Sequence, residues 1–197
     1  MKSRPVSFLK VDNEDKQEIL RILKKHKVDI NPESLLKCAE SSKGFLSICA
    51  VKALAFTDAT DVISRLKVLV QGRSSDMATV ALITIARLAG AKENQYYISL
   101  IRSKTYKDKL VLASILWEVG DDSALPEMRY LADQIILGEI KHVELDNDPL
   151  YISEYLHKYS QEVKDLERIE QLERLYRKNA WGYLEYLKHW ISKHKKG

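Results

Sequence analysis

The chain has 197 residues, of which 45% are hydrophobic and 30% are charged, so it can bury a core and is neither a disordered chain nor a membrane chain. Its net charge of +4 comes from 32 basic and 28 acidic residues, and the mixing of their signs is not typical of a nucleic-acid-binding module. Seven Gly and four Pro supply little turn chemistry, so a sheet-rich fold is not expected.

Helix signals begin near the N-terminus and recur along the chain. Asp12 precedes an acidic first turn and Asn31 precedes Pro32, which are arrangements typical of helix N-termini. Gly90 and Gly120 each follow an apolar run and are suited to be left-handed C-caps. The pattern predicts helices at about 13–27, 32–42, 45–56, 59–71, 76–89, 92–103, 107–119, 123–140, 149–159, 161–178 and 180–194.

A period of 31 residues runs through the middle of the chain. Leu54, Ile85 and Leu116 are spaced by this period. The same spacing relates further apolar positions: Ala50 and Ala81; Leu66, Tyr97 and Met128; and Leu69, Leu100 and Leu131. Each period has room for two helices of about a dozen residues, so we predict helical hairpins stacked about three times.

Residues 81–90 and 112–124 resemble the second helix of a HEAT repeat. Their small residues let helices approach, and Gly120 followed by Asp121 makes the turn into the next unit. The resemblance covers about residues 32–137. It implies an all-α fold, a right-handed stack of antiparallel helix pairs (a HEAT-like α-solenoid), with a C-terminal helical extension packing on it. Armadillo-like and other helical-hairpin arrays are alternatives.

The repeat departs from the family's pattern at several positions. Pro126 lies in the first turn of its helix, and Arg87 and Glu118 stand where the first unit has Phe56. These departures put the register of the units in doubt. We expect an N-terminal helix or cap at 1–30, HEAT-like repeats at 31–140 and aromatic-rich C-terminal helices at 141–197, the last forming one compact unit with the repeats.

The second helices of the units, near 76–88 and 107–118, have almost no polar stripe. A helix that is apolar all round is normally buried all round. We therefore expect these helices to be covered, either by the C-terminal helices or by a protein partner.

The C-terminal part is rich in aromatic residues. Tyr151, Tyr155 and Tyr159 are spaced four apart, which places them on one helix face. A second group comprises Trp181, Tyr183, Leu184, Tyr186, Leu187, Trp190 and Ile191. Such rings either pack on the repeats or anchor an interface. Residues 161–178 between them suggest a surface helix with one buried face, so the chain is expected to be a monomer or a weak homodimer.

The family resemblance also carries an expected function. HEAT-like proteins usually bind macromolecules on their concave surface, which implies a non-catalytic protein-binding module. A short, free-standing helical-repeat protein also looks like several bacterial toxin-neutralising immunity proteins, so a toxin domain is one candidate partner. The expected partner-binding residues are Arg87, Trp117, Glu118, Asp121, Asp122, Tyr151, Tyr155 and Tyr159. The structural alternatives for them are helix-end capping and core packing.

The sequence contains none of the common catalytic motifs. It has no phosphate-binding glycine loop, no Cys-x-x-Cys, no Gly-x-Ser-x-Gly and no His-Glu-x-x-His. We therefore expect no enzyme activity, no catalytic residues, no cofactor and no metal. Two Glu-x-x-His spacings, Glu139/His142 and Glu154/His157, leave a small helical metal-binding protein as an alternative.

Nucleic acid is not expected as a partner. The basic clusters at 24–27 and 193–196 sit at predicted helix ends, where the helix dipole stabilises cations. Some DNA glycosylases also have a HEAT-like fold and place an acidic residue beside aromatic rings in a basic groove. Trp117 with Asp121 or Asp122 could imitate that arrangement, so a glycosylase-like protein is a second alternative.

Several features favour the cytoplasm. Cys38 and Cys49 lie among apolar neighbours, as small buried residues of a reducing compartment do. Residues 1–5 lead into no apolar signal segment, and no stretch reaches the roughly 18 apolar residues of a spanning helix. We expect no membrane association.

Overall fold

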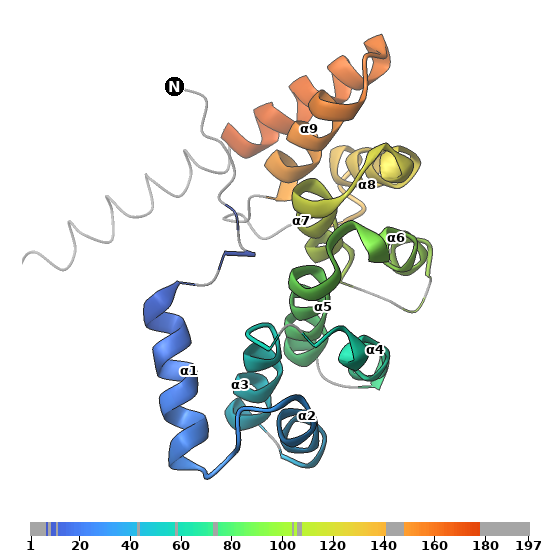
Figure 1. The fold of residues 1–197 in the computed structure, drawn as a ribbon. Coiled ribbons are helices and arrows are strands. Elements are labelled where there is room, and N and C mark those ends of the chain that lie inside the picture. Colours follow the sequence, from blue (N-terminus) through green and yellow to red (C-terminus); the bar gives the residue numbers. More distant parts are fainter. Residues whose placement is uncertain are drawn as a thin grey trace, which may run out of the picture. The chain divides into compact units, whose positions relative to one another are not determined.

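The computed structural model describes residues 7, 9–10, 12–42, 44–57, 59–72, 75–103, 105, 108–140 and 148–177. Within these ranges the chain is all-helical and contains no strand, which confirms the predicted fold class at this level (Figure 1). They form two compact units, Ser7–Tyr96 and the residues from Tyr97 onward. The boundaries predicted near residues 30 and 140 stay predictions. The helix predicted at 180–194 and its aromatic group lie outside the described residues.

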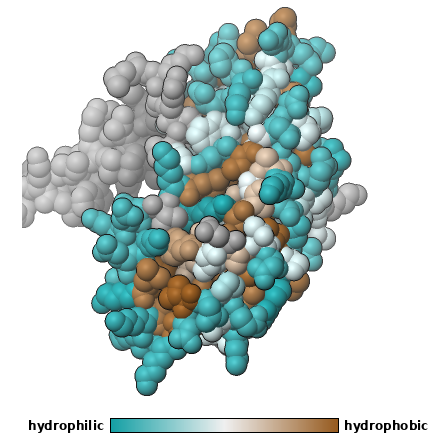
Figure 2. Space-filling view, viewed as in Figure 1, coloured by the Kyte–Doolittle hydropathy of each residue, from teal (hydrophilic) through white to brown (hydrophobic). Residues whose placement is uncertain are grey.

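The first unit is built from pairs of short helices. Its elements are α1 (Asn13–Lys25), α2 (Pro32–Ser41), α3 (Phe45–Leu54), η1 (Thr60–Val62), α4 (Ile63–Gly72), α5 (Ser75–Ala89), η2 (Gly90–Glu93) and the start of α6 (Asn94–Arg102). Helix α2 packs against α3 and α4 against α5, while α3 also contacts α5. Helix α1 lies along α3, and apolar residues gather where the two meet (Figures 1 and 2).

The helix ends follow from local chemistry in most cases. The Asp12 side chain accepts a hydrogen bond from Glu14 N at 3.1 Å, and that of Asn31 accepts one from Ser34 N at 2.9 Å, as N-caps do. Gly90 has φ +54°, the left-handed conformation that was predicted. Gly120 was predicted to be left-handed and is not, since its φ is −76° and its ψ is 173°. Glycine is needed there because a Cβ would collide with the Leu116 carbonyl oxygen.

The second unit continues with α7 (Lys109–Val119), η3 (Asp122–Ala124), α8 (Leu125–Ile136), α9 (Asp148–Tyr159) and a helical stretch over residues 163–177. Helix α9 packs against both α7 and α8. It therefore covers part of α7, as was expected of the C-terminal helices. This cover is incomplete, because Val80 and Ile83 of α5 and Trp117 to Val119 of α7 are partly exposed, and cover by a protein partner stays a prediction.

The apolar positions that recur every 31 residues all belong to the core. Ile85 and Leu116, for example, are fully buried, and every other position of the four predicted series is buried as well. Burial extends the pattern beyond residue 137, where the resemblance was expected to end. Ile169 and Leu172 are buried and follow Met128 and Leu131 by 41 residues, which is ten residues more than one period. None of the described helices has the length and apolar content to cross a membrane.

One core position of this pattern is polar. Asn94 is 4% exposed and stands 31 residues from both Ile63 and Leu125, which are half-buried apolar residues. Neither Oδ1 nor Nδ2 of Asn94 has a hydrogen-bond partner among the described residues. Burying an amide without partners costs about 1–3 kcal/mol. Asn94 is therefore a weak point in the core.

We expect Asn94→Leu to raise the free energy of unfolding by about 1–2 kcal/mol, because it removes the unpaired amide and restores the apolar residue of the period. Urea denaturation followed by circular dichroism measures the change. Asn13→Leu, at an exposed site on α1, is the control and should change stability by less than about 0.5 kcal/mol. A lower stability for Asn94→Leu would mean that the amide is hydrogen-bonded in solution.

Candidate partner-binding surface

The C-terminal end of α7 turns sharply into η3 and carries a group of acidic residues. Trp117 and Glu118 lie in the last turn of α7 and are half-exposed, whereas Asp121 and Asp122 in the following turn are exposed. Asp121 Oδ1 accepts a hydrogen bond from Ser123 N at 3.0 Å and thereby caps η3. We call Trp117, Glu118, Asp121 and Asp122 the acidic corner.

Side chains from α9 fasten the backbone of the acidic corner. The Tyr155 hydroxyl donates to the Asp121 carbonyl, and the Tyr159 hydroxyl donates to the Gly120 carbonyl at 2.7 Å. The ring centroids of Trp117 and Tyr151 are 5.2 Å apart, within the range of favourable aromatic pairs. The structure thus brings together the predicted partner-binding residues of the second unit.

The three tyrosines of α9 differ in how much surface they offer. Tyr155 is fully buried, Tyr151 is 9% exposed and Tyr159 is half-exposed. Burial raises the pKa of the Tyr155 hydroxyl well above its ordinary value, so this group remains a hydrogen-bond donor at physiological pH. In this structure Tyr151 and Tyr155 are core residues, and a partner can reach the acidic corner and Tyr159.

Arg87 belongs to the first unit, whereas the other predicted residues belong to the second. It is half-exposed in the last turn of α5, and its Nε donates a hydrogen bond to the Leu9 carbonyl at 2.9 Å. Arg87 therefore ties the described part of the N-terminal segment to α5. Its role in partner binding stays a prediction.

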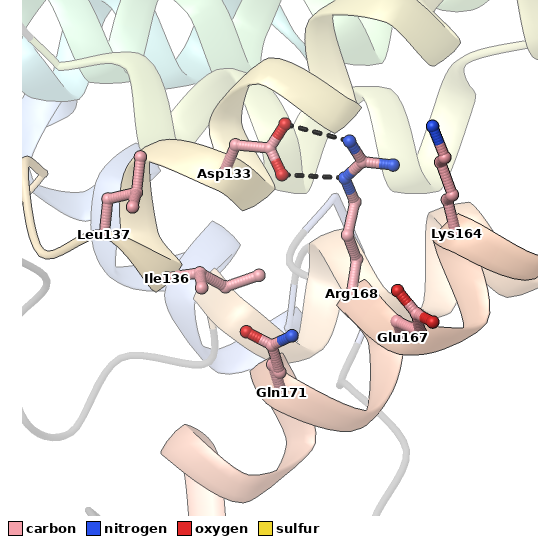
Figure 3. Close-up of a pocket in the computed structure, with 7 residues that line it drawn as sticks. All are labelled: Asp133, Ile136, Leu137, Lys164, Glu167, Arg168 and Gln171. Atoms are coloured by element: carbon pink, nitrogen blue, oxygen red, sulfur yellow. Dashed lines mark hydrogen bonds and ion pairs between the residues drawn. The ribbon is translucent and has the colours of Figure 1, made fainter.

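An ion-pair network between α8 and the helix at 163–177 was not predicted from the sequence. Asp165 is 1% exposed and receives Arg129 Nε and Arg168 Nη1, each at 2.9 Å. Arg168 also makes a bidentate pair with Asp133, at 2.7 and 3.0 Å (Figure 3). Burial alone would raise the pKa of the Asp165 carboxyl, but hydrogen bonds from Arg129 and Ser160 and the nearby charges outweigh it and lower that pKa.

A shallow pocket of about 390 Å³ lies beside this network. Its lining comprises Asp133, Ile136, Leu137, Lys164, Glu167, Arg168 and Gln171 (Figure 3). The bidentate pair between Asp133 and Arg168 engages two of the four charged side chains in the lining, and Lys164 and Glu167, the other two, are on the exposed face of the second helix. The pocket therefore reflects how the two helices are joined.

Other chemistry-bearing residues are not gathered into a site in the described parts of the chain. No three His, Cys, Asp or Glu side chains of the described residues could hold a metal together. Of the two Glu-x-x-His spacings, His142 lies outside the described residues, and Glu154 is half-buried while His157 is exposed. Cys38 and Cys49 are both buried, and burial raises the pKa of the Cys49 thiol.

The basic clusters are only partly covered by the structure. Residues 24–27 are exposed at the end of α1, where the helix dipole favours cations. Residues 193–196 lie outside the described residues.

Comparisons with models of protein families, with curated proteins and with solved structures gave no match to this chain.

Proposed function

We propose that the protein is a non-catalytic protein-binding module that meets its partner with the acidic corner. The observation that carries this proposal is the fixed backbone there, where the Gly120 and Asp121 carbonyls accept hydrogen bonds from Tyr159 and Tyr155. A surface that is already ordered loses less conformational entropy on binding. The half-exposed Trp117 adds an aromatic anchor of the kind enriched in interfaces.

The chemistry of the corner indicates the kind of partner. Exposed carboxylates at Asp121 and Asp122 favour a basic protein surface, because charge matching steers association and excludes wrong partners. The same carboxylates repel nucleic-acid phosphates. A toxin domain neutralised by direct binding in the cytoplasm is the candidate that the family resemblance implies, with the protein acting as a monomer or a weak homodimer.

Burial and charge support a HEAT-like build for each unit. The 31-residue series is buried in both units, and the Glu40–Arg65 pair of the first unit has a counterpart in the second. That counterpart, Arg102–Glu127, lies two periods further along the chain with the charges reversed. We infer that stacked helix pairs of the HEAT type form each unit.

The proposal is tested by neutralising the corner without removing its cap. Asp121→Asn/Asp122→Asn keeps a side-chain acceptor for Ser123 N, because asparagine caps about as well as aspartate. We expect a partner that co-purifies with the wild-type chain from its source cell to bind this variant at least about tenfold more weakly, and the difference to shrink in high salt. Mass spectrometry identifies the partner and biolayer interferometry measures the affinity.

A matched control distinguishes an effect of the acidic corner from an effect of the changed net charge. Glu14→Gln/Asp15→Asn removes two exposed carboxylates from the first turn of α1 and should leave binding unchanged. Equal weakening by both variants would count against the corner as the binding surface. Salt-dependent retention of the wild-type chain on duplex DNA would instead favour the nucleic-acid alternative.

A further inference from the structure

Equivalent positions of the period carry ion pairs that join one helix to another. The three pairs are Glu40–Arg65, Arg102–Glu127 and Asp133–Arg168. Their first members are 62 and 31 residues apart, which are two periods and one. Each pair joins helices of the same unit: α2 to α4, α6 to α8, and α8 to the helix at 163–177. In these three pairs the period marks a position where opposite charges join two helices, whichever sign comes first, whereas Gln71, one period after Glu40, stands at this position without a charge.

Helix α8 shows how the charges at this position, which we call the holding position, join two helices. Arg129 and Asp133 lie one turn apart on α8, and they pair with Asp165 and Arg168, which are three residues apart on the following helix. On α8 the basic residue, Arg129, precedes the acidic one, Asp133. On the helix at 163–177, with which they pair, the acidic residue precedes the basic one. A wrong order would place like charges opposite one another.

The helix at 163–177 carries the same holding position. The buried residues Ile169 and Leu172 follow Met128 and Leu131 by 41 residues. The same offset relates Arg129 to Glu170 and Asp133 to Arg174. Glu170 and Arg174 reverse the charge order found on α8. Their side chains are 72% and 78% exposed and pair with each other at 3.4 Å.

An apolar residue beside these charges also lacks the burial of its equivalents. Leu166 is 51% exposed. By the same offsets it corresponds to Leu125 and Ile63, which are half-buried, and to Asn94, which is buried. An apolar side chain and a charge pair that elsewhere lie between helices thus face solvent here.

We propose that Leu166, Glu170 and Arg174 form a docking face for one amphipathic helix of a partner protein. That helix presents a basic residue followed three positions later by an acidic residue, the reverse of Asp165 and Arg168. Charge complementarity selects this occupant, because the order on the docking face is the reverse of the order on α8. The competing explanation is an ordinary solvated face of a surface helix, whose charges pair only with each other.

Peptides derived from the chain's own helix test the charge order. One stapled helical peptide has the sequence of residues 160–177, and a second carries Asp165→Arg/Arg168→Asp. Fluorescence anisotropy with the full chain should show that the swapped peptide binds at least about tenfold more tightly than the unswapped one. In the protein variant Glu170→Arg/Arg174→Glu this preference should reverse.

The control reverses a similar exposed pair elsewhere. Glu18→Arg/Arg21→Glu on α1 swaps two charges three residues apart and should leave the peptide preference unchanged. Absence of saturable binding by either peptide would overturn the proposal and identify the face as an ordinary solvated helix surface. A preference that does not respond to Glu170→Arg/Arg174→Glu would overturn it as well. The result is independent of the acidic corner, which keeps its residues in all of these variants.

Discussion

Replacing Tyr155 by alanine should lower the free energy of unfolding by about 3–5 kcal/mol, the usual cost of deleting a large buried aromatic side chain. Tyr155 is fully buried in α9, its ring centroid lies 4.7 Å from that of Tyr159, and its hydroxyl donates to the Asp121 carbonyl. The substitution leaves a cavity between α9 and its neighbours and removes one of the two tethers of the acidic corner. Urea denaturation at pH 7 measures the loss.

Tyr155→Phe separates the hydrogen bond from the packing. It keeps the ring and removes the hydroxyl, so the expected loss is about 1–2 kcal/mol, because the Asp121 carbonyl loses its buried donor. Tyr159→Phe, at a half-exposed ring with the equivalent bond to the Gly120 carbonyl, should cost less. If Tyr155→Ala cost under about 1 kcal/mol, α9 would not be fixed on α7 as the structure has it.

The sequence predicted those features of the fold that depend on neighbouring residues. Asp12 and Asn31 start helices because their side chains accept hydrogen bonds from backbone groups two and three residues further on. The conformation predicted for Gly120 from its place after an apolar run was wrong. Gly120 is required because the Leu116 carbonyl approaches too closely for a Cβ, and not because its φ is positive. Both requirements select glycine, so the sequence does not distinguish them.

The candidate site was predictable in its residues and not in its arrangement. The four-residue spacing of Tyr151, Tyr155 and Tyr159 does place them together, but the spacing cannot say what lies opposite that face. The contacts of Tyr155 and Tyr159 reach 34 and 39 residues back to the turn after α7, a separation at which local patterns carry no information. Two of the three rings are consequently core, and the exposed surface is the turn that they hold.

The charge positions of the period were visible in the sequence and were still missed. Glu40, Arg102 and Asp133 recur at multiples of 31 residues, but their sign alternates, so a search for similar residues does not connect them. The positions are recognised as equivalent only when the structure shows that each of these side chains pairs with an opposite charge on another helix. The sequence predicted that residues 161–178 form a surface helix with one buried face, but among its many charges it did not reveal that the Asp165 carboxylate is buried.

We expect Asp165→Ala to destabilise the protein by about 2–4 kcal/mol, because it removes the buried acceptor shared by Arg129 and Arg168, which keep only their more exposed partners Glu162 and Asp133. Arg129 and Arg168 converge on Asp165 and are themselves only about a quarter exposed, at 26% and 23%. Glu167→Ala, at an exposed position of the same helix, is the control and should change stability by less than about 0.5 kcal/mol. Guanidinium chloride should be avoided as denaturant because its salt screens the network, so urea is used.

The pH dependence tests whether the ionised carboxylate is what holds the helix. The pKa of Asp165 is lowered in the folded protein, so its contribution to stability is complete above its unfolded pKa of about 3.9 and is lost as the pH falls through the lower folded value. The stability difference between the wild type and Asp165→Asn should therefore be largest at pH 7 and narrow below about pH 4. A difference that stayed constant from pH 7 to pH 3 would mean that shape and hydrogen bonding, and not charge, join this helix to α8.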